Sequence, residues 1–519
     1  MWLDFATFKD KVEGCWAGKN IGGVLGAPME GHRGLLDVSF YTQDLSEGPP
    51  PNDDLDLQIV WLAAVERYGR NVNAAILGEY WLSFVIPNWV EYGMGKNNMR
   101  VGLMPPLSGV TDNPYKDSCG CFIRSEIWAC LAPGNPDIAA RYAYEDAIVD
   151  HGDEGMYGEV FFAAMQSAAF VESDKDKLVD IGLSYIPEDC AVARCVRLAR
   201  KCFQDGLPLG EMRKKVHAEA PGTFGAQLWT LKELEKSIAE GFEVGAPGYD
   251  APENVGFTIG AWYYGGDDFG ASLCNAVNCG EDTDCTAATL GALMGIIHGA
   301  KALPEKWTAP LGGKIKTLCI DDTSLGVFVP KTVDELTNRV LRVVPSFMGL
   351  THCDIFAEGG YAIRTLTGDD LFCPPLHVRL PGINGNARVK PLHISELTSS
   401  NHIVRYDNTA FRLAVDYHEG PFFQTGEPRK ITVVAEDNGF MRNQHWINFR
   451  LLVPEGVDVL TGREVSLPLN YNHGNKAEMT FEIVDTPLFT NGKMEIILDV
   501  SLNGRHSSAP VKIVLMRSK

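Results

Sequence analysis

The sequence has few positive charges for its length. Its 519 residues include 46 Lys and Arg against 67 Asp and Glu, which gives a formal net charge of −21. A surface with this excess of acids repels a nucleic-acid backbone and anionic lipid headgroups. We therefore expect no nucleic-acid partner and no membrane partner, and a small neutral or metal-chelated ligand fits better.

The usual cysteine and histidine motifs of zinc and redox proteins are missing. The thirteen cysteines form no CxxC pair and none lies beyond Cys373, and the twelve histidines show neither HxH nor HExxH spacing. These absences exclude a zinc ribbon, a CxxC redox site and a zinc hydrolase of the HExxH type. An odd number of scattered cysteines is typical of reduced thiols, so we expect a cytoplasmic protein.

Long apolar runs are also missing. The first sixteen residues, MWLDFATFKDKVEGCW, alternate charged and apolar side chains and lack the unbroken apolar stretch of a signal peptide. Residues 287–302 are apolar but too few to span a bilayer, and they include His298 and Lys301. We expect a buried helix there.

Two different hydrophobic periods divide the chain. Apolar residues recur three and four positions apart before about residue 370, which predicts helices at 9–26, 56–69, 135–150, 158–173, 191–205, 226–241, 284–300 and 332–344. Alternation of period two follows, which predicts strands at 411–420, 429–439, 446–456, 477–485, 494–504 and 511–517. The sequence thus predicts a multidomain protein, with a large all-α domain at 1–370 followed by an antiparallel β-sandwich domain at 371–519.

Glycines recur every four residues in two of the predicted helices. They are Gly14, Gly18, Gly22 and Gly26 in the first helix and Gly291, Gly295 and Gly299 in the second. Each lowers helix propensity by about 1 kcal/mol relative to alanine. We interpret the pattern as a close contact between these two helices, because positions without side chains let backbones approach. By contrast, Gly265-Gly266-Asp267-Asp268 is interpreted as a turn with no helix directly behind it.

Acidic residues gather just before two of the predicted helices. The first cluster is PNDDLD at 51–56, the second is NCGEDTDCT at 278–286, and Glu30 follows the first glycine-rich helix. Single acids at helix starts are most simply caps. Three acids in four residues repel one another, however, and a hard cation between them would remove the conflict. The two clusters and Glu30 together offer enough oxygen ligands for two divalent cations, Mg²⁺ or Mn²⁺.

The order and spacing of four motifs resemble the ADP-ribosylglycohydrolase family, which is related to dinitrogen reductase-activating glycohydrolase. The motifs are GCWAGKNIGGVLGAPMEG, NDD, SCGCFIR and NCGEDTDCTAATLGALMGIIHG, and the resemblance covers roughly residues 10–305. It implies an all-α fold around a two-metal centre.

The resemblance also implies roles for individual residues. It places Asn52, Asp53, Asp54, Asp282 and Asp284 at the metal motifs, with Thr286 as a further candidate ligand. It gives Glu30 an acid/base or gating role and places Gly120, Cys121 and Arg124 in a loop that lines the ligand pocket; Asp53 and Asp284 are further catalytic candidates. Apart from the resemblance, His151 is a substrate-binding candidate because Asp153 lies two residues on, although a surface turn is the simpler interpretation. Two of the departures from the family motifs concern the centre directly. Asn52 stands in place of threonine. Cys285 stands in place of the last threonine of the second motif, and a thiol binds Mg²⁺ poorly, so that ligand position passes to Thr286, passes to water or is lost.

Three functions remain open at this point. The first is a metal-dependent glycoside hydrolase that cleaves an N- or O-ribosyl bond of an ADP-ribosyl or related conjugate. The second keeps the scaffold and the metals but acts on a nucleoside or a non-nucleotide glycoside. The third is a non-catalytic binding protein, like the crystallin-type members of the family. The sequence does not give the oligomeric state.

Overall fold

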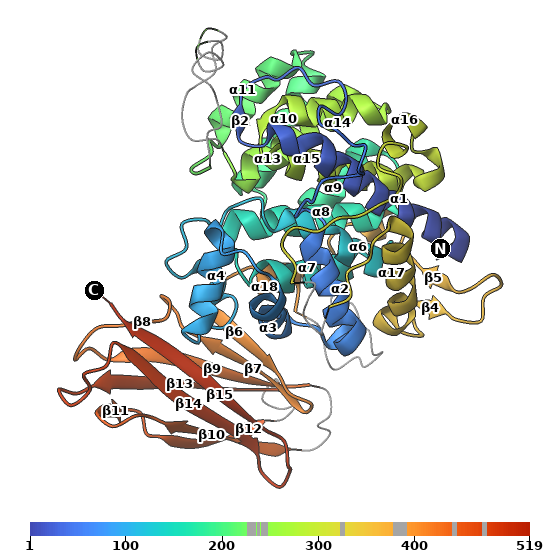
Figure 1. Ribbon diagram of the computed structural model, residues 1–519. Coiled ribbons are helices and arrows are strands. Elements are labelled where there is room, and N and C mark those ends of the chain that lie inside the picture. Colours follow the sequence, from blue (N-terminus) through green and yellow to red (C-terminus); the bar gives the residue numbers. More distant parts are fainter. Residues whose placement is uncertain are drawn as a thin grey trace.

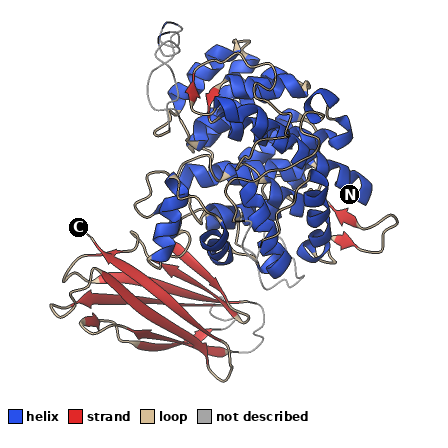
Figure 2. Ribbon diagram, viewed as in Figure 1, coloured by secondary structure: helices blue, strands red, loops and turns tan. Residues whose placement is uncertain are grey.

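A computed structural model describes residues 1–225, 248–321, 327–376, 392–438, 444–469 and 475–518, together with positions 235 and 239. The chain forms a helical part followed by a β-rich part (Figures 1 and 2). The α-helices are α1 (Phe5–Gly26), α2 (Asp56–Tyr68), α3 (Ala74–Phe84), α4 (Val90–Arg100), α5 (Leu107–Val110), α6 (Glu126–Leu131), α7 (Pro136–Ala147), α8 (Asp153–Ala169), α9 (Lys175–Ser184), α10 (Ala191–Gln204), α11 (Leu209–Glu219), α13 (Ala251–Gly265), α14 (Phe269–Asn278), α15 (Thr283–His298), α16 (Glu305–Thr308), α17 (Val333–Met348) and α18 (Ile394–Leu397). Short 3₁₀ helices are η1 (Ala27–Met29), η2 (Gly69–Asn71), η3 (Phe122–Arg124), η4 (Ala300–Ala302) and η5 (Gly368–Leu371).

Helices α1 and α15 form the closest helix pair at the centre of the helical domain. A Cβ atom added at Gly18 would collide with the carbonyl oxygen of Gly291, and one added at Gly22 would collide with that of Ala287. Gly14 meets Gly295 in the same way. The glycine pattern is therefore explained by backbone contact, and the start of α15 lies beside the end of α1.

Two small sheets complete the helical domain. Strand β1 (Trp2–Leu3) pairs with β5 (Ala362–Arg364), which pairs with β4 (Cys353–Asp354). Strand β2 (His32–Arg33) pairs with β3 (Gly280–Glu281), with His32 opposite Glu281. This second pairing joins the segment after α1 to the segment before α15.

Two five-stranded sheets form the C-terminal domain. The strands are β6 (Ile403–Asp407), β7 (Phe411–Asp416), β8 (Phe422–Phe423), β9 (Arg429–Asp437), β10 (His445–Leu452), β11 (Val457–Val459), β12 (Glu464–Leu469), β13 (Lys476–Asp485), β14 (Lys493–Leu502) and β15 (Ser508–Arg517). Their orders are β12-β10-β14-β15-β8 and β11-β13-β9-β7-β6, and the pairs are antiparallel except for β15 with β8. Alternate residues of both sheets, such as Val433 and Leu498, share one buried cluster.

The junction between the domains is packed on both sides. Leu103 and Leu107 from the helical domain belong to the buried cluster of the β domain. Conversely, Leu371, Ile394 and Leu397 pack into the helical core, although they lie beyond the predicted boundary at 370. A cavity of about 760 Å³ lies between the domains, and its lining includes helix α7 and strands β6, β7 and β9.

The predicted helices and strands agree with the described structure at most positions. The helix predicted at 226–241 lies outside the described residues, apart from positions 235 and 239. The turn expected at Gly265–Asp268 is present at positions 266 and 267. The expectation that no helix starts directly behind it is wrong, because α14 begins at Phe269 and the Asp268 side chain caps it by accepting a hydrogen bond from the Ala271 N–H (2.8 Å). Among the described residues, no helix is both long and apolar enough to cross a membrane.

Candidate metal centre

The segments that carry the acidic residues meet at the facing ends of α1 and α15. The β2–β3 pair is extended by a hydrogen bond from the Gly31 N–H to the Glu281 carbonyl oxygen (2.9 Å). Glu30 precedes Gly31 and Asp282 follows Glu281, so this hydrogen bond holds Glu30 near Asp282. The fold thus brings together two acids that are about 250 positions apart in the sequence.

The start of α2 reaches the same point from a third direction. The Asn52 side-chain nitrogen lies 3.4 Å from an oxygen of Asp284, and its side-chain oxygen accepts a hydrogen bond from the Asp54 N–H (2.8 Å). Asn52 therefore bridges the two acidic clusters, and in this arrangement its oxygen is already engaged by the backbone. The convergence expected for Asp53, Asp54, Asp282 and Asp284 is present in the fold.

The carboxylates of this group do not act as helix caps. Asp282 occupies the N-cap position of α15 but accepts no capping hydrogen bond, and the N-cap of α2 is Leu55. Asp54 is 3% exposed and Asp282 is 7% exposed. Within the part of the chain that the structure describes, Asp54 Oδ2 and Asp282 Oδ1 have no hydrogen-bond partner. Buried carboxylate oxygens without donors are strongly disfavoured unless a cation or a proton compensates them.

The electrostatics of the group show mutual repulsion. The negative charge of Asp284, followed by burial and by Asp53, raises the pKa of Glu30 to about 8. Burial and then Asp284 raise the pKa of Asp53 to about 6. Burial is also the main cause that raises the pKa of Asp54 and Asp282 well above the usual range, and Asp284 adds to both. The group therefore gains free energy from any positive charge placed among its oxygens.

Lys19 is a buried cation whose charge acts on this group. Its ammonium lies 3.2 Å from Glu126 Oε1 and 3.4 Å from Thr289 Oγ1. It favours the charged forms of Asp53, Asp54 and Asp284 from a distance, but its ion pair is with Glu126. Among the residues that the structure describes, no lysine or arginine forms a direct ion pair with Asp53, Asp54, Asp282 or Asp284.

Glu281, next to Asp282, is neutralised by two arginine side chains. Its carboxylate is fully buried and forms ion pairs with Arg33 (2.9 Å) and Arg213. It also accepts a hydrogen bond from the Gly248 N–H (2.6 Å). Of the three acids at 281–284, Glu281 is therefore structural, while Asp282 and Asp284 face the acidic group.

The loop at 118–121 forms another wall of the centre. The Cys119 N–H donates to the Tyr249 carbonyl oxygen (2.8 Å), and the side chain of Tyr249 is hydrogen bonded to Glu30. The Cys119 thiol contacts Asp282 and Cys285. A side chain at Gly120 would collide with Glu91, because Glu91 Oε1 lies where a Cβ atom would be.

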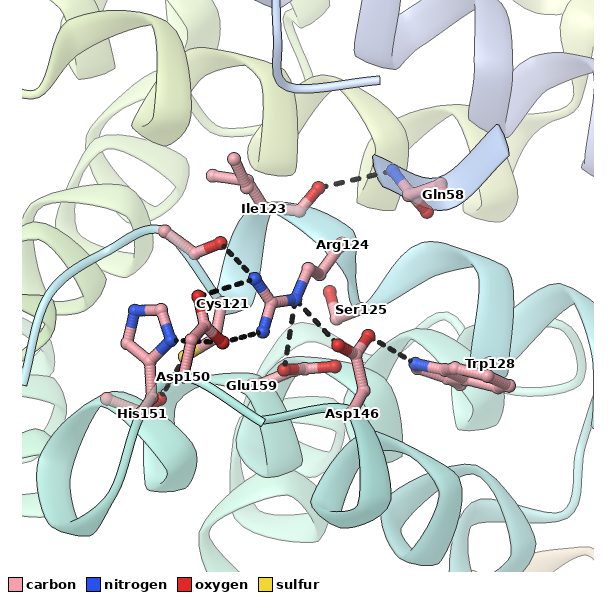
Figure 3. A network of polar contacts seen from close by, with 12 residues as sticks. Gln58, Cys121, Ile123, Arg124, Ser125, Trp128, Asp146, Asp150, His151 and Glu159 are labelled. Carbon is pink, nitrogen blue, oxygen red and sulfur yellow. Dashed lines mark hydrogen bonds and ion pairs between the residues drawn. The ribbon is translucent and has the colours of Figure 1, made fainter. Parts of the chain in front are cut away.

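Behind this loop, Arg124 is the hub of a fully buried ion network (Figure 3). Its guanidinium is 2.7 Å from Asp146 and 2.6 Å from Asp150, and it donates to the Gly120 carbonyl oxygen (3.1 Å). His151 extends the network, with Nδ1 2.9 Å from Asp150 and Nε2 2.7 Å from Ser118 Oγ. The network fixes the loop that carries Cys119.

A model of the ADP-ribosylglycohydrolase family matches residues 4–341. The chain belongs to this family. An uncharacterized protein of Archaeoglobus fulgidus is 24% identical over 319 residues, which are 58% of this chain and 90% of that protein. A solved structure described as an ADP-ribosylglycohydrolase-related protein complex is 18% identical, with a TM-score of 0.43, and covers 66% of this chain and all of that chain.

Membership of the ADP-ribosylglycohydrolase family supports a glycohydrolase-like function and fits a centre that takes divalent cations. Glu30, Asp53, Asp54, Asp282 and Asp284 lie together as the sequence predicts. Their roles as ligands or catalytic groups remain predictions.

The structure places the other candidates differently. The side chains of Cys121, Arg124 and His151 are fully buried in the framework behind the loop, and the Thr286 hydroxyl donates to the Thr283 carbonyl oxygen (3.2 Å). Neither these contacts nor the position of Gly120 against Glu91 points to a ligand. Sequence reasoning did not assign a role to Lys19 or Tyr249. Lys19 lies within the first glycine-rich motif and Tyr249 lies in none of the four motifs, and the contacts of both residues depend on tertiary packing that the sequence does not display.

Proposed function

We propose that the protein is a divalent-metal-dependent glycoside hydrolase that cleaves an N- or O-ribosyl bond of an ADP-ribosyl or related conjugate. The observation that carries this proposal is the convergence of carboxylates from the starts of α2 and α15 that do not cap these helices. Two of their buried oxygens have no donor among the described residues. Family membership supports the glycohydrolase class. The choice of a ribosyl bond rests on the resemblance of the motifs.

The residues present fit a divalent-cation centre. Asp53, Asp54, Asp282 and Asp284 would hold the metal, since Asp54 Oδ2 and Asp282 Oδ1 are buried and have no partner in the described part of the chain. Hard cations prefer carboxylate oxygens. When bound, divalent cations would chelate vicinal sugar hydroxyls and lower the pKa of a bound water. We expect Mg²⁺ or Mn²⁺ to support this chemistry.

Glu30 is suited to handle the proton of the reaction. Its carboxyl lies next to the aspartates that would hold the metal, and the charge of Asp284, with burial and Asp53, raises its pKa to about 8 in the protein alone. Glycoside cleavage needs an acid that protonates the leaving group as positive charge develops on the sugar. The side chain of Tyr249 orients Glu30 through its hydrogen bond.

The proposal is tested with the full chain on a panel of substrates. The panel compares ADP-ribosylated arginine and serine with simple nitrophenyl glycosides, in Mg²⁺, in Mn²⁺ and in a chelator. We expect metal-dependent release of ADP-ribose, and we expect Glu30→Gln to lose turnover while it retains metal binding. Asp174→Asn is the matched control, because Asp174 caps the distant helix α9 and asparagine preserves a cap.

The outcomes of the panel separate the three open functions. Hydrolysis of nitrophenyl glycosides without release of ADP-ribose would replace the ribosyl substrate by another glycoside. Activity on neither class, together with no binding of Mg²⁺ or Mn²⁺ by calorimetry, would contradict the proposed function and indicate a binding protein.

A further inference from the structure

Two cysteine thiols lie against the acidic group. Cys119 is 1% exposed and Cys285 is 8% exposed, and their thiols are in hydrogen-bonding contact with each other. Both thiols also contact the carboxyl group of Asp282. The contacts join the loop at 118–121 to the first turn of α15.

The positions of these thiols are fixed by the backbone. The Cys119 N–H donates to Tyr249, and its carbonyl oxygen accepts from Phe122 (3.0 Å). Cys285 lies in the first turn of α15, and its N–H donates to Asp284 Oδ1 (3.1 Å). The sulfur atoms are therefore held at the edge of the carboxylate group by rigid elements.

Donor atoms of three of these residues are close enough to share one ion. One carboxylate oxygen each from Asp282 and Asp284 and the Cys285 sulfur all lie within 4.8 Å of one another. A second observation points to a ligand at this place, because Asp282 Oδ1 is buried and has no partner among the described residues. Cys119 adds a further sulfur beside Asp282 and Cys285.

The chemistry of this donor set differs from that of an all-oxygen site. Mg²⁺ requires oxygen ligands in near-octahedral geometry, whereas zinc-like cations accept sulfur and oxygen together and suit four donors. Asp282, Asp284 and Cys285 supply three donors of such a set and leave the fourth position to water. Binding would form a metal–sulfur bond and release the Cys285 thiol proton to solvent.

We propose that Asp282, Asp284 and Cys285 form a mixed carboxylate–thiolate site that selects a borderline-soft divalent cation, such as Zn²⁺, Fe²⁺ or Co²⁺, over Mg²⁺. This inference rests on the proposed function, since it names the cation that occupies one side of the same centre. Asp53 and Asp54 remain the oxygen-only side.

Cobalt(II) is the probe that tests the inference, because Co²⁺ bound to thiolate has a sulfur-to-metal charge-transfer band in the near ultraviolet. Titration of the metal-free full chain with Co²⁺ is expected to give this band, and Zn²⁺ is expected to abolish it by displacement. Cys285→Ser is expected to lose the band. Cys373→Ser is the control, because Cys373 is only partly buried and contacts His393 outside the centre.

A competition experiment gives a readout that needs no optical band. The ratio of Zn²⁺ to Mg²⁺ affinity in the unaltered protein is compared with that of Cys285→Ser, after circular dichroism has shown that the variant is folded. We expect the ratio to fall at least about tenfold, since even residues behind a ligand change metal affinity by that amount. If the variant does not fold, the cobalt spectrum of the unaltered protein decides.

The results that overturn the inference are distinct from those that overturn the proposed function. Co²⁺ binding without a charge-transfer band, or an unchanged affinity ratio in Cys285→Ser, would contradict sulfur ligation and leave a metal-dependent hydrolase intact. Failure of the protein to bind any divalent cation would contradict both.

Discussion

Replacement of Asp284 by asparagine tests whether the acidic group is a metal centre or an ordinary acidic cluster, because these two interpretations predict opposite changes in protein stability. Asparagine has nearly the same shape and can still accept the contact from Asn52. It removes the negative charge of Asp284, which is the largest cause of the raised pKa of Glu30.

The size and sign of the effect follow from this pKa shift. Because the pKa of Glu30 is raised to about 8, the folded protein binds more protons than the unfolded chain above the ordinary glutamate pKa. Stability of the metal-free protein therefore falls as the pH rises through this window, and the loss is complete above the raised pKa. Each pKa unit corresponds to about 1.4 kcal/mol, and Asp284 is the largest of the three causes that raise this pKa. Its removal is therefore worth about 2 kcal/mol near pH 9.

Bound metal is expected to reverse the order of stability of the unaltered protein and Asp284→Asn. A cation at a hundredfold excess over its Kd stabilises the folded state by about 3 kcal/mol. We expect metal-free Asp284→Asn to be at least as stable as the unaltered protein near pH 9. We also expect it to lose most of the stabilisation that Mn²⁺ provides.

Thermal and denaturant unfolding in a chelator and in saturating Mn²⁺ measure both effects. Asp174→Asn serves as the control and is expected to keep the full response to Mn²⁺. A metal-free Asp284→Asn that is clearly less stable than the unaltered protein, yet keeps the whole metal response, would refute the reasoning.

Three further predictions concern packing, the buried network and pH. Gly18→Val should destabilise the helical domain by about 3 kcal/mol or more in denaturant unfolding, because any Cβ atom at this position meets the α15 backbone. The control Gly492→Ala faces open space and should change stability little. Equal effects of the two substitutions would contradict the packing of α1 on α15. Arg124→Lys should lower the free energy of unfolding by about 3 kcal/mol while metal binding by the folded fraction is kept, since it breaks a buried network; a selective loss of substrate affinity would instead restore its predicted ligand role. Burial and the charge of Asp407 raise the pKa of Glu145 to about 7, although the Ala74 N–H and Arg405 lower it. The stability of the protein relative to Glu145→Gln should therefore fall by on the order of 2–3 kcal/mol as the pH rises from about 4.5 to 7. Parallel pH profiles of the two proteins would contradict this.

Sequence periodicity predicts most of the long elements because their packing depends on local pattern. The repeat of Gly14, Gly18 and Gly22 predicts a close helix pair, and the structure supplies the partner in α15. The short helix α14 escapes prediction because its start, GDDFGASL, places turn residues and a cap directly before the apolar stretch. Strands β6, β8, β11 and β12 are short or lie at sheet edges, where alternation is brief.

The candidate site is predictable only as far as its local motifs reach. Acids that precede a helix are visible in the sequence, and the approach of Glu30 to Asp282 and Asp284 follows once α1 and α15 pair. The approach of α2 to the same point depends on tertiary packing that no motif predicts. Which acid is neutralised is not visible, because Glu281 is held by Arg33 and Arg213 from other segments. For the same reason, Arg124 resembles a pocket residue in the sequence while the fold buries it between Asp146 and Asp150.

The position of a bound cation tests the account most directly. Crystals of the full chain soaked in Mn²⁺ and measured for anomalous scattering should show a peak enclosed by Asp53, Asp54, Asp282 and Asp284. A map at saturating Mn²⁺ with no peak there, and with these carboxylates paired to lysine or arginine side chains, would contradict the metal centre and the hydrolase built on it.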